Sequence, residues 1–149
     1  MTLFEAPVYD ARKARRRNIT IAIVVIVLLI LAGLGWWFRN WPEEHVADKF
    51  FAALEQKDFK SAYAIWLNDK GWEQKPPSPN YPFADFYRDW GPSGDWGPIN
   101  SYHIDGSSRP SGSNGVVVVV TINHRKEQGT VFVDKRDHTM SFSPFEVVK

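Results

Sequence analysis

Twenty consecutive residues without a charged side chain, Ile19–Phe38, constrain this chain more than any other feature. A helix of that length is about 30 Å long, which matches the hydrocarbon core of a bilayer. Five cationic side chains lie just before it: Arg12, Lys13, Arg15, Arg16 and Arg17. The apolar run and the cluster predict a transmembrane helix, residues 18–40, after a basic tail, residues 1–17.

Two other interpretations of the apolar run compete with a transmembrane helix. A cleaved signal peptide has a shorter apolar run, about 7–15 residues, and a small-x-small cleavage site. Here the best cleavage match, Gly33-Leu34-Gly35, is followed by the bulky Trp36. A buried core helix would not need five flanking cations. We therefore favour a retained signal-anchor helix in the lipid bilayer.

The basic cluster also predicts the direction of the helix. Cytoplasmic flanks of membrane helices carry an excess of Lys and Arg, so we expect the N-terminus in the cytoplasm and the C-terminal domain outside. Trp36, Trp37 and Trp41 then lie at the outer interface, where amphipathic rings are favoured. The sequence predicts a single-pass protein of the inner (plasma) membrane.

Charge is divided unevenly between the two parts of the chain. Residues 1–40 carry six Lys or Arg and two Asp or Glu, a net charge of +4, whereas residues 41–149 carry 12 and 15, a net charge of −3. A mildly acidic domain is a poor match for nucleic acid, so no such partner is expected. The absence of cysteine excludes disulfides, thiol nucleophiles and thiolate metal ligands.

The N-terminal tail has two interpretations. It carries a few apolar side chains among charged ones: Leu3, Phe4, Val8 and Tyr9. A disordered tail is the simpler interpretation, and a docking peptide for a neighbouring subunit is the sharper one.

Three helices are expected after the membrane segment. Pro42 suits a first helical turn, and apolar residues recur at helical spacing over residues 43–56. Asp58 is the expected N-cap of a second helix, residues 58–68, for which Gly71 is available as a left-handed C-cap. After a proline-rich loop, residues 72–82, the pattern predicts a short third helix, Phe83–Trp90.

From Ile99 onward the apolar residues alternate, which indicates strands. The expected strands are Ile99–Asp105, Val116–Arg125, Thr130–Lys135 and His138–Val148, the last bulged at Pro144. Short connections make this an antiparallel meander. The side chains expected to face the core are Val116, Val118, Val120 and Ile122, with Tyr102, Ile104, Met140 and Phe142 on neighbouring strands.

This order predicts an α+β domain, residues 41–149, with about three helices packed on a curved four-stranded antiparallel sheet. The segment VADKFFAALEQKDFKSAY, residues 46–63, resembles the opening helix pair of the nuclear transport factor 2-like (cystatin-like) superfamily. The resemblance extends over residues 43–148 and rests mainly on core positions. It implies a cone-shaped domain with a pocket between sheet and helices. The superfamily includes enzymes, ligand binders and assembly modules, so it leaves the function open.

The candidate acid–base residues are few: His124, Tyr102, Tyr87 and Asp85. His124 continues the apolar face of its strand, but a histidine bonded at the strand end is the simpler interpretation. Asp85 and Asp89 share a helix face, as carboxylates on solvated faces commonly do. No catalytic residue or cofactor is predicted. No metal site is predicted either, because the four histidines lack the spacing of metal ligands: His45, His103, His124 and His138.

Three functions follow as hypotheses. We favour a non-catalytic interaction or accessory-subunit module for a membrane or envelope complex, because aromatic residues on loops are plausible anchors: Tyr81, Phe83, Trp90 and Trp96. The alternative is a small-molecule site in the cone, lined by Tyr63, Trp66, Tyr87, Tyr102 and His124. An isomerase or dehydratase type of enzyme is the third hypothesis.

Overall fold

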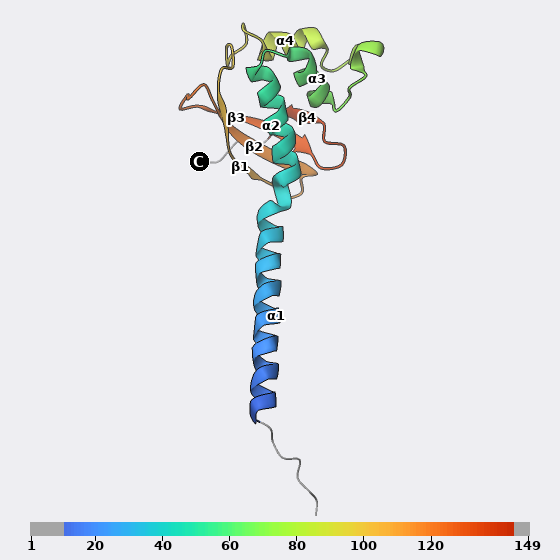
Figure 1. Cartoon of the computed structure of the whole chain (residues 1–149). Helices are drawn as coiled ribbons and strands as arrows, with labels where there is room; N and C mark the ends of the chain where they lie inside the picture. The colour runs from blue at the N-terminus through green and yellow to red at the C-terminus, as the bar shows by residue number, and fades with distance from the viewer. Residues whose placement is uncertain (1–10, 145–149) are drawn as a thin grey trace, which may run out of the picture. The chain divides into compact units, whose positions relative to one another are not determined.

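The computed structural model describes residues 11–144, which form two compact units divided between Arg39 and Asn40. Four α-helices and four β-strands occur within these residues. The first unit contains the helix α1, Ala11–Trp37, and the second contains the other α-helices and the sheet (Figure 1). The candidate docking residues of the N-terminal tail, Leu3 to Tyr9, lie outside the described residues.

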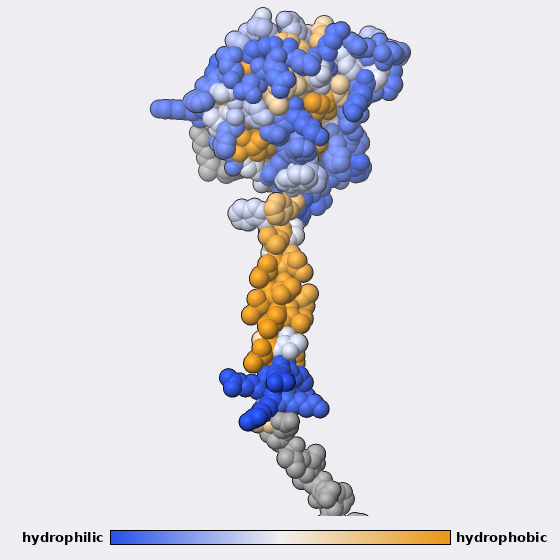
Figure 2. All heavy atoms as spheres, in the orientation of Figure 1, coloured by the Kyte–Doolittle hydropathy of each residue, from blue (hydrophilic) through white to orange (hydrophobic). Residues whose placement is uncertain are grey.

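Helix α1 is apolar around its whole circumference. None of its residues is buried, and from Ile19 to its end at Trp37 it has no charged side chain. The helix begins at Ala11, so the cationic cluster occupies its first two turns, next to the apolar band (Figure 2). Among residues 11–144 it is the one helix long and apolar enough to span a membrane.

The second unit begins with a helix pair. Helix α2, Trp41–Glu55, has proline in its first turn, and helix α3, Phe59–Leu67, is capped by Asp58, whose carboxylate accepts the Ser61 N–H at 3.1 Å. The left-handed residue that ends α3 is Asn68, with φ 48°, so the prediction of Gly71 in this position is wrong. Asparagine is one of the few residues other than glycine that adopt this conformation readily, and here its side-chain amide donates to the Asp137 carbonyl at 2.7 Å.

Helix α4, Phe83–Trp90, has the predicted bounds. The loop before it contains a single 3₁₀ turn, η2, Trp72–Gln74, and a similar turn, η1, Phe38–Asn40, precedes α2. Proline before α4 and glycine after it mark the two ends, which is why the bounds could be read from the sequence.

The sheet is an antiparallel meander of order β1-β2-β3-β4, as predicted. Its strands are β1, Tyr102–Ser108; β2, Gly115–Ile122; β3, Gln128–Asp134; and β4, Met140–Phe142. The predicted start of β1 at Ile99 is wrong, because the chain enters the sheet at Tyr102 and continues past a bulge between Ile104 and Gly106. The predicted extension of β4 beyond Pro144 lies outside the described residues.

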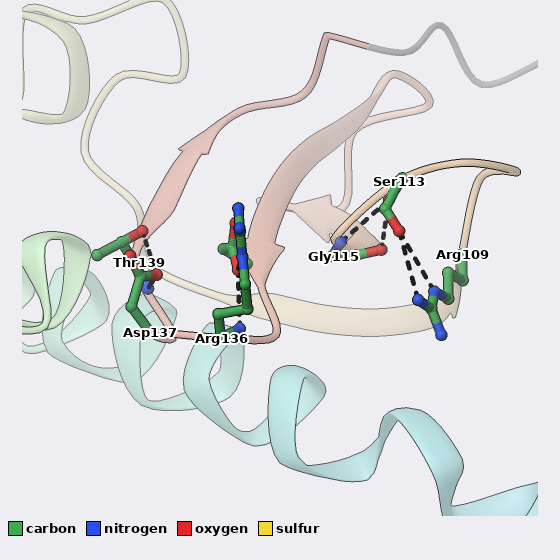
Figure 3. A network of polar contacts seen from close by, with 7 residues as sticks. Arg109, Ser113, Gly115, Arg136, Asp137 and Thr139 are labelled. Atoms are coloured by element: carbon green, nitrogen blue, oxygen red, sulfur yellow. Dashed lines mark hydrogen bonds and ion pairs between the residues drawn. The ribbon is translucent and has the colours of Figure 1, made fainter.

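The two loops at one end of the sheet are closed by local hydrogen bonds (Figure 3). In the β1–β2 loop, the Ser113 hydroxyl donates to the Gly115 carbonyl at 2.7 Å and accepts the Gly115 N–H at 3.1 Å. In the β3–β4 turn, the Asp137 carboxylate accepts both the N–H and the hydroxyl of Thr139, at 2.9 and 2.7 Å. These turns fix the ends of the strands without contributing to the core.

The core lies between the three helices and one face of the sheet. The predicted inward positions of β2 are fully buried: Val116, Val118, Val120 and Ile122. Helix α2 packs on this face and contacts β1, β2 and β3, while α3 contacts β4 (Figure 1). The parity prediction for β2 is confirmed as far as Ile122.

Candidate functional site

Aromatic rings fill the space between the helices and the sheet. Phe50 of α2 lies at the centre, with its ring centroid 5.1 to 6.1 Å from those of Phe51, Trp66, Phe86 and Trp90. Offset and edge-to-face pairs at such distances add to the hydrophobic contribution of each ring. The region in which a cone would hold a ligand is therefore occupied by the protein's own side chains.

The five residues proposed to line a pocket do not surround one cavity. Tyr63 and Trp66 are buried in the ring cluster, with 1% and 3% of their surface exposed. Tyr87 is 45% exposed on α4, and Tyr102 packs against the ring of Phe51 at the start of β1.

His124 lies outside the core. Strand β2 ends at Ile122, and Asn123 and His124 both adopt positive φ, 51° and 57°, in the turn that follows. His124 therefore does not continue the inward face, and its position fits the simpler interpretation, a histidine bonded at the end of the strand. Its imidazole is exposed and lies 3.1 Å from the Ser101 hydroxyl.

Asn123 has a structural role that the sequence did not reveal. Its side-chain oxygen accepts the Asn100 N–H at 2.8 Å, and its amide group donates to the carbonyls of Trp96 and Pro98 at 3.3 and 3.0 Å. The Lys57 ammonium donates to the neighbouring Ile99 carbonyl. These bonds hold the long connection between α4 and β1, which includes the sequence Trp-Gly-Pro at residues 96–98.

Two half-buried tyrosines donate to carboxylates. Tyr102 donates to Asp48 at 2.8 Å, and Tyr81 donates to Asp89 at 3.0 Å. Burial, followed by the adjacent carboxylate, raises the pKa of both hydroxyls above the usual value for tyrosine. Both hydroxyls stay protonated at neutral pH and already have acceptors, so neither is suited to act as a base.

The carboxylates of α4 share one cation. Arg88 contacts Asp85 through Nη1 at 2.8 Å and Asp89 through Nε at 3.2 Å. This arrangement is an exposed ion-pair network rather than a carboxylate pair that shares a proton. Within residues 11–144, no group of three or more His, Cys, Asp or Glu side chains could hold a metal ion.

The predicted interface residues differ in exposure. Tyr81, Phe83 and Trp96 are partly exposed, whereas Trp90 is 5% exposed and stacks on Phe142. Trp90 therefore belongs to the core and not to the surface. Met140 and Phe142 are both predicted to face inward. Met140 is buried, whereas Phe142 packs against Trp90 on the core side but remains 50% exposed.

The described residues of the second unit line several surface grooves, of which three are considered in turn. One of about 570 Å³ lies between α2 and α3. One of about 550 Å³ runs along the proline-rich loop, beside Tyr63, Trp72 and Phe83. One of about 420 Å³ lies beside Trp96 and Phe142. These grooves could not be predicted from residue patterns, because their shape depends on how the loops pack against the helices.

A buried carboxylate lies at the start of α2. Glu43 is 4% exposed, and its Oε2 lies 3.8 Å from the Lys135 ammonium. Next to it, Glu44 accepts the hydroxyl of Ser107 at 2.5 Å. In the sequence both glutamates fit the common pattern of acidic residues in the first turn of a helix. Their contacts beyond the helix could therefore not be predicted.

Comparison of the chain with known protein families, with curated proteins and with solved structures gives no match. The resemblance to the nuclear transport factor 2-like superfamily stays a prediction.

Proposed function

We propose that this chain is a single-pass membrane protein whose domain is a non-catalytic interaction module, an accessory subunit of a membrane or envelope complex. The observation that carries the proposal is α1, which exposes apolar side chains on every side. Such a helix is stable in lipid, where no buried core is needed to cover it. The cationic cluster at its start supports a cytoplasmic N-terminus and an external domain.

The short connection supports a partner in the same membrane. Only the three residues of η1, Phe38–Asn40, separate α1 from α2 in the sequence. A tether of that length leaves the domain little room to reach a target away from the bilayer.

The packing of the domain favours binding over catalysis. Rings occupy its interior, and the candidate acid–base groups are dispersed among an exposed turn, an ion-paired helix face and a tyrosine bonded to Asp48. We propose that the domain keeps the cone architecture of the nuclear transport factor 2-like superfamily with a filled interior. This arrangement weighs against a ligand pocket in the cone and against an isomerase or dehydratase activity.

Exposed rings supply the candidate contact surface. Tyr87 and Phe142 are 45% and 50% exposed, and the partly exposed Tyr81 and Phe83 lie near them in the ring cluster. Large aromatic groups at a surface are typical anchors of protein interfaces.

Extraction in a mild detergent, followed by native gels and crosslinking in intact membranes, tests the proposal. We expect the full-length protein to migrate in an assembly larger than the detergent-bound monomer. Tyr87→Ser with Phe142→Ser should weaken that assembly, whereas Ser111→Ala in the β1–β2 loop should not. A free monomer under all extraction conditions, with no crosslinked neighbour, would contradict the proposal.

A further inference from the structure

The groove between α2 and α3 combines an apolar floor with a cationic rim. Its floor is formed by partly exposed apolar residues of both helices and of η2: Val46, Ala64, Ile65 and Trp72. With a volume of about 570 Å³ it falls within the range of sites that bind a ligand or a few peptide side chains.

Three lysines border this groove and only one carboxylate does. Lys49 comes from α2, Lys60 from α3 and Lys70 from the turn after α3, whereas Glu73 is the single acid. The groove therefore carries a local charge of +2 in a domain segment, residues 41–149, whose net charge is −3.

The acids close to Lys49 and Lys70 are already paired with other side chains. Glu73 pairs with Lys60 at 2.7 Å, and Asp69, next to Lys70, pairs with Lys75 at 2.6 Å. Asp48, next to Lys49, accepts the hydroxyl of Tyr102. Lys49 and Lys70 have no ion-pair or hydrogen-bond partner within residues 11–144.

We infer that this groove binds an acidic protein segment in which carboxylates flank an apolar side chain. The carboxylates would pair with Lys49 and Lys70, and the apolar side chain would cover the floor near Ile65. A concave apolar floor suits an inserted side chain better than a flat lipid surface, and two free cations are few for nucleic acid. The inference rests on the proposed function, because it names the chemistry of the partner.

A defined peptide tests the binding chemistry directly. The full-length ¹⁵N-labelled protein in zwitterionic micelles is titrated with the acetylated, amidated hexapeptide EELLEE, and with QQLLQQ as the uncharged control. We expect amide shifts confined to residues 46–49 and 60–73 with EELLEE only. Exposed ion pairs of this kind change affinity by about 1.4- to fivefold each, so Lys49→Gln with Lys70→Gln should weaken binding by about two- to 25-fold.

The control variant is Lys126→Gln in the β2–β3 turn, which removes an exposed lysine outside the groove. Thermal unfolding of each variant checks that the fold is kept, and Lys49→Arg with Lys70→Arg should restore binding if charge is the cause. Equal binding of EELLEE to the double Gln variant, or equal shifts with QQLLQQ, would overturn the inference. Binding of the lysines to phosphatidylglycerol vesicles without any response to EELLEE would also overturn it, in favour of lipid headgroups.

The same variants on native gels separate the two proposals. If the wild type and Lys126→Gln assemble and the double Gln variant does not, both proposals are supported. If all three assemble, the groove is not the contact and the proposed function stands. If none assembles, the proposed function fails and the inference fails with it.

Discussion

Helices α1 and α2 follow each other in the chain and are built for different surroundings. Helix α1 has no buried residue, and its Ile, Val and Leu side chains are exposed on all sides. Helix α2 buries one face, including Phe50, Phe51 and Leu54, and leaves the other polar. Hydrophobicity alone therefore does not decide whether a side chain is buried. The apolar face of α2 is covered by the sheet, whereas the apolar side chains of α1 are exposed within residues 11–144.

The largest loss of stability should come from a substitution on the buried face of α2. Phe50→Ala removes a ring with four aromatic neighbours, and such truncations cost about 3–5 kcal/mol of unfolding free energy. Chemical denaturation of the full-length protein in micelles measures it. The matched control is Tyr87→Ala, which truncates an exposed ring, and an equal loss in both variants would contradict the comparison.

The comparison also predicts that a charge in α1 impairs membrane retention and leaves the stability of the domain unchanged. Leu28→Arg places a charge in the middle of the apolar run, at a cost of about 2.5–3.5 kcal/mol in a bilayer centre. Carbonate extraction should find less of this variant in the membrane pellet, while the domain keeps its denaturation midpoint. Leu28→Ile is the control. Unchanged membrane retention of the Arg variant would show that α1 does not span the bilayer.

Much of this contrast could be predicted from the sequence, because it depends on the spacing of residues that are close together in the chain. The bounds of α4 and the inward face of β2 follow from spacing and from flanking Pro and Gly. The end of β2 could not be predicted, because Asn123 and His124 are non-glycine residues held at positive φ by contacts with a distant loop. The grooves and the burial of Glu43 depend on which surfaces meet in three dimensions, and residue patterns do not encode that directly.

A smaller effect is expected where α2 meets the edge of the sheet. Tyr102→Phe removes the hydrogen bond to Asp48, and bonds to charged groups contribute about 1.5–3 kcal/mol, less at a half-exposed site such as this one. We expect a modest fall in the denaturation midpoint, with Tyr87→Phe, an exposed hydroxyl, as the control.

Alkaline pH adds a second measurement on Tyr102. Burial and Asp48 raise the pKa of its hydroxyl in the folded state, so the folded protein keeps a proton that the unfolded chain loses near pH 10. The stability from this group is therefore present below about pH 10 and falls as the pH rises further. Tyr102→Phe should show a smaller alkaline loss than the wild type. An identical pH profile would mean that Tyr102 does not carry this linkage.

The smallest effect concerns the start of α3, the helix that pairs with α2. Asp58→Ala removes the cap on the Ser61 N–H and should cost about 1 kcal/mol, whereas Asp58→Asn should retain most of the stability. The hydrogen bonds from Ser61 lower the pKa of Asp58, so its contribution is present above the unfolded pKa of about 3.9 and is lost as the pH falls below it. Denaturation midpoints at pH 7 and pH 3 measure both effects. Because α1 contributes nothing to this cap, the loss of stability should be the same in a protein that also carries Leu28→Ile. A different loss would mean that the two sites are coupled, and it would contradict the conclusion that α1 and the domain are stabilised independently.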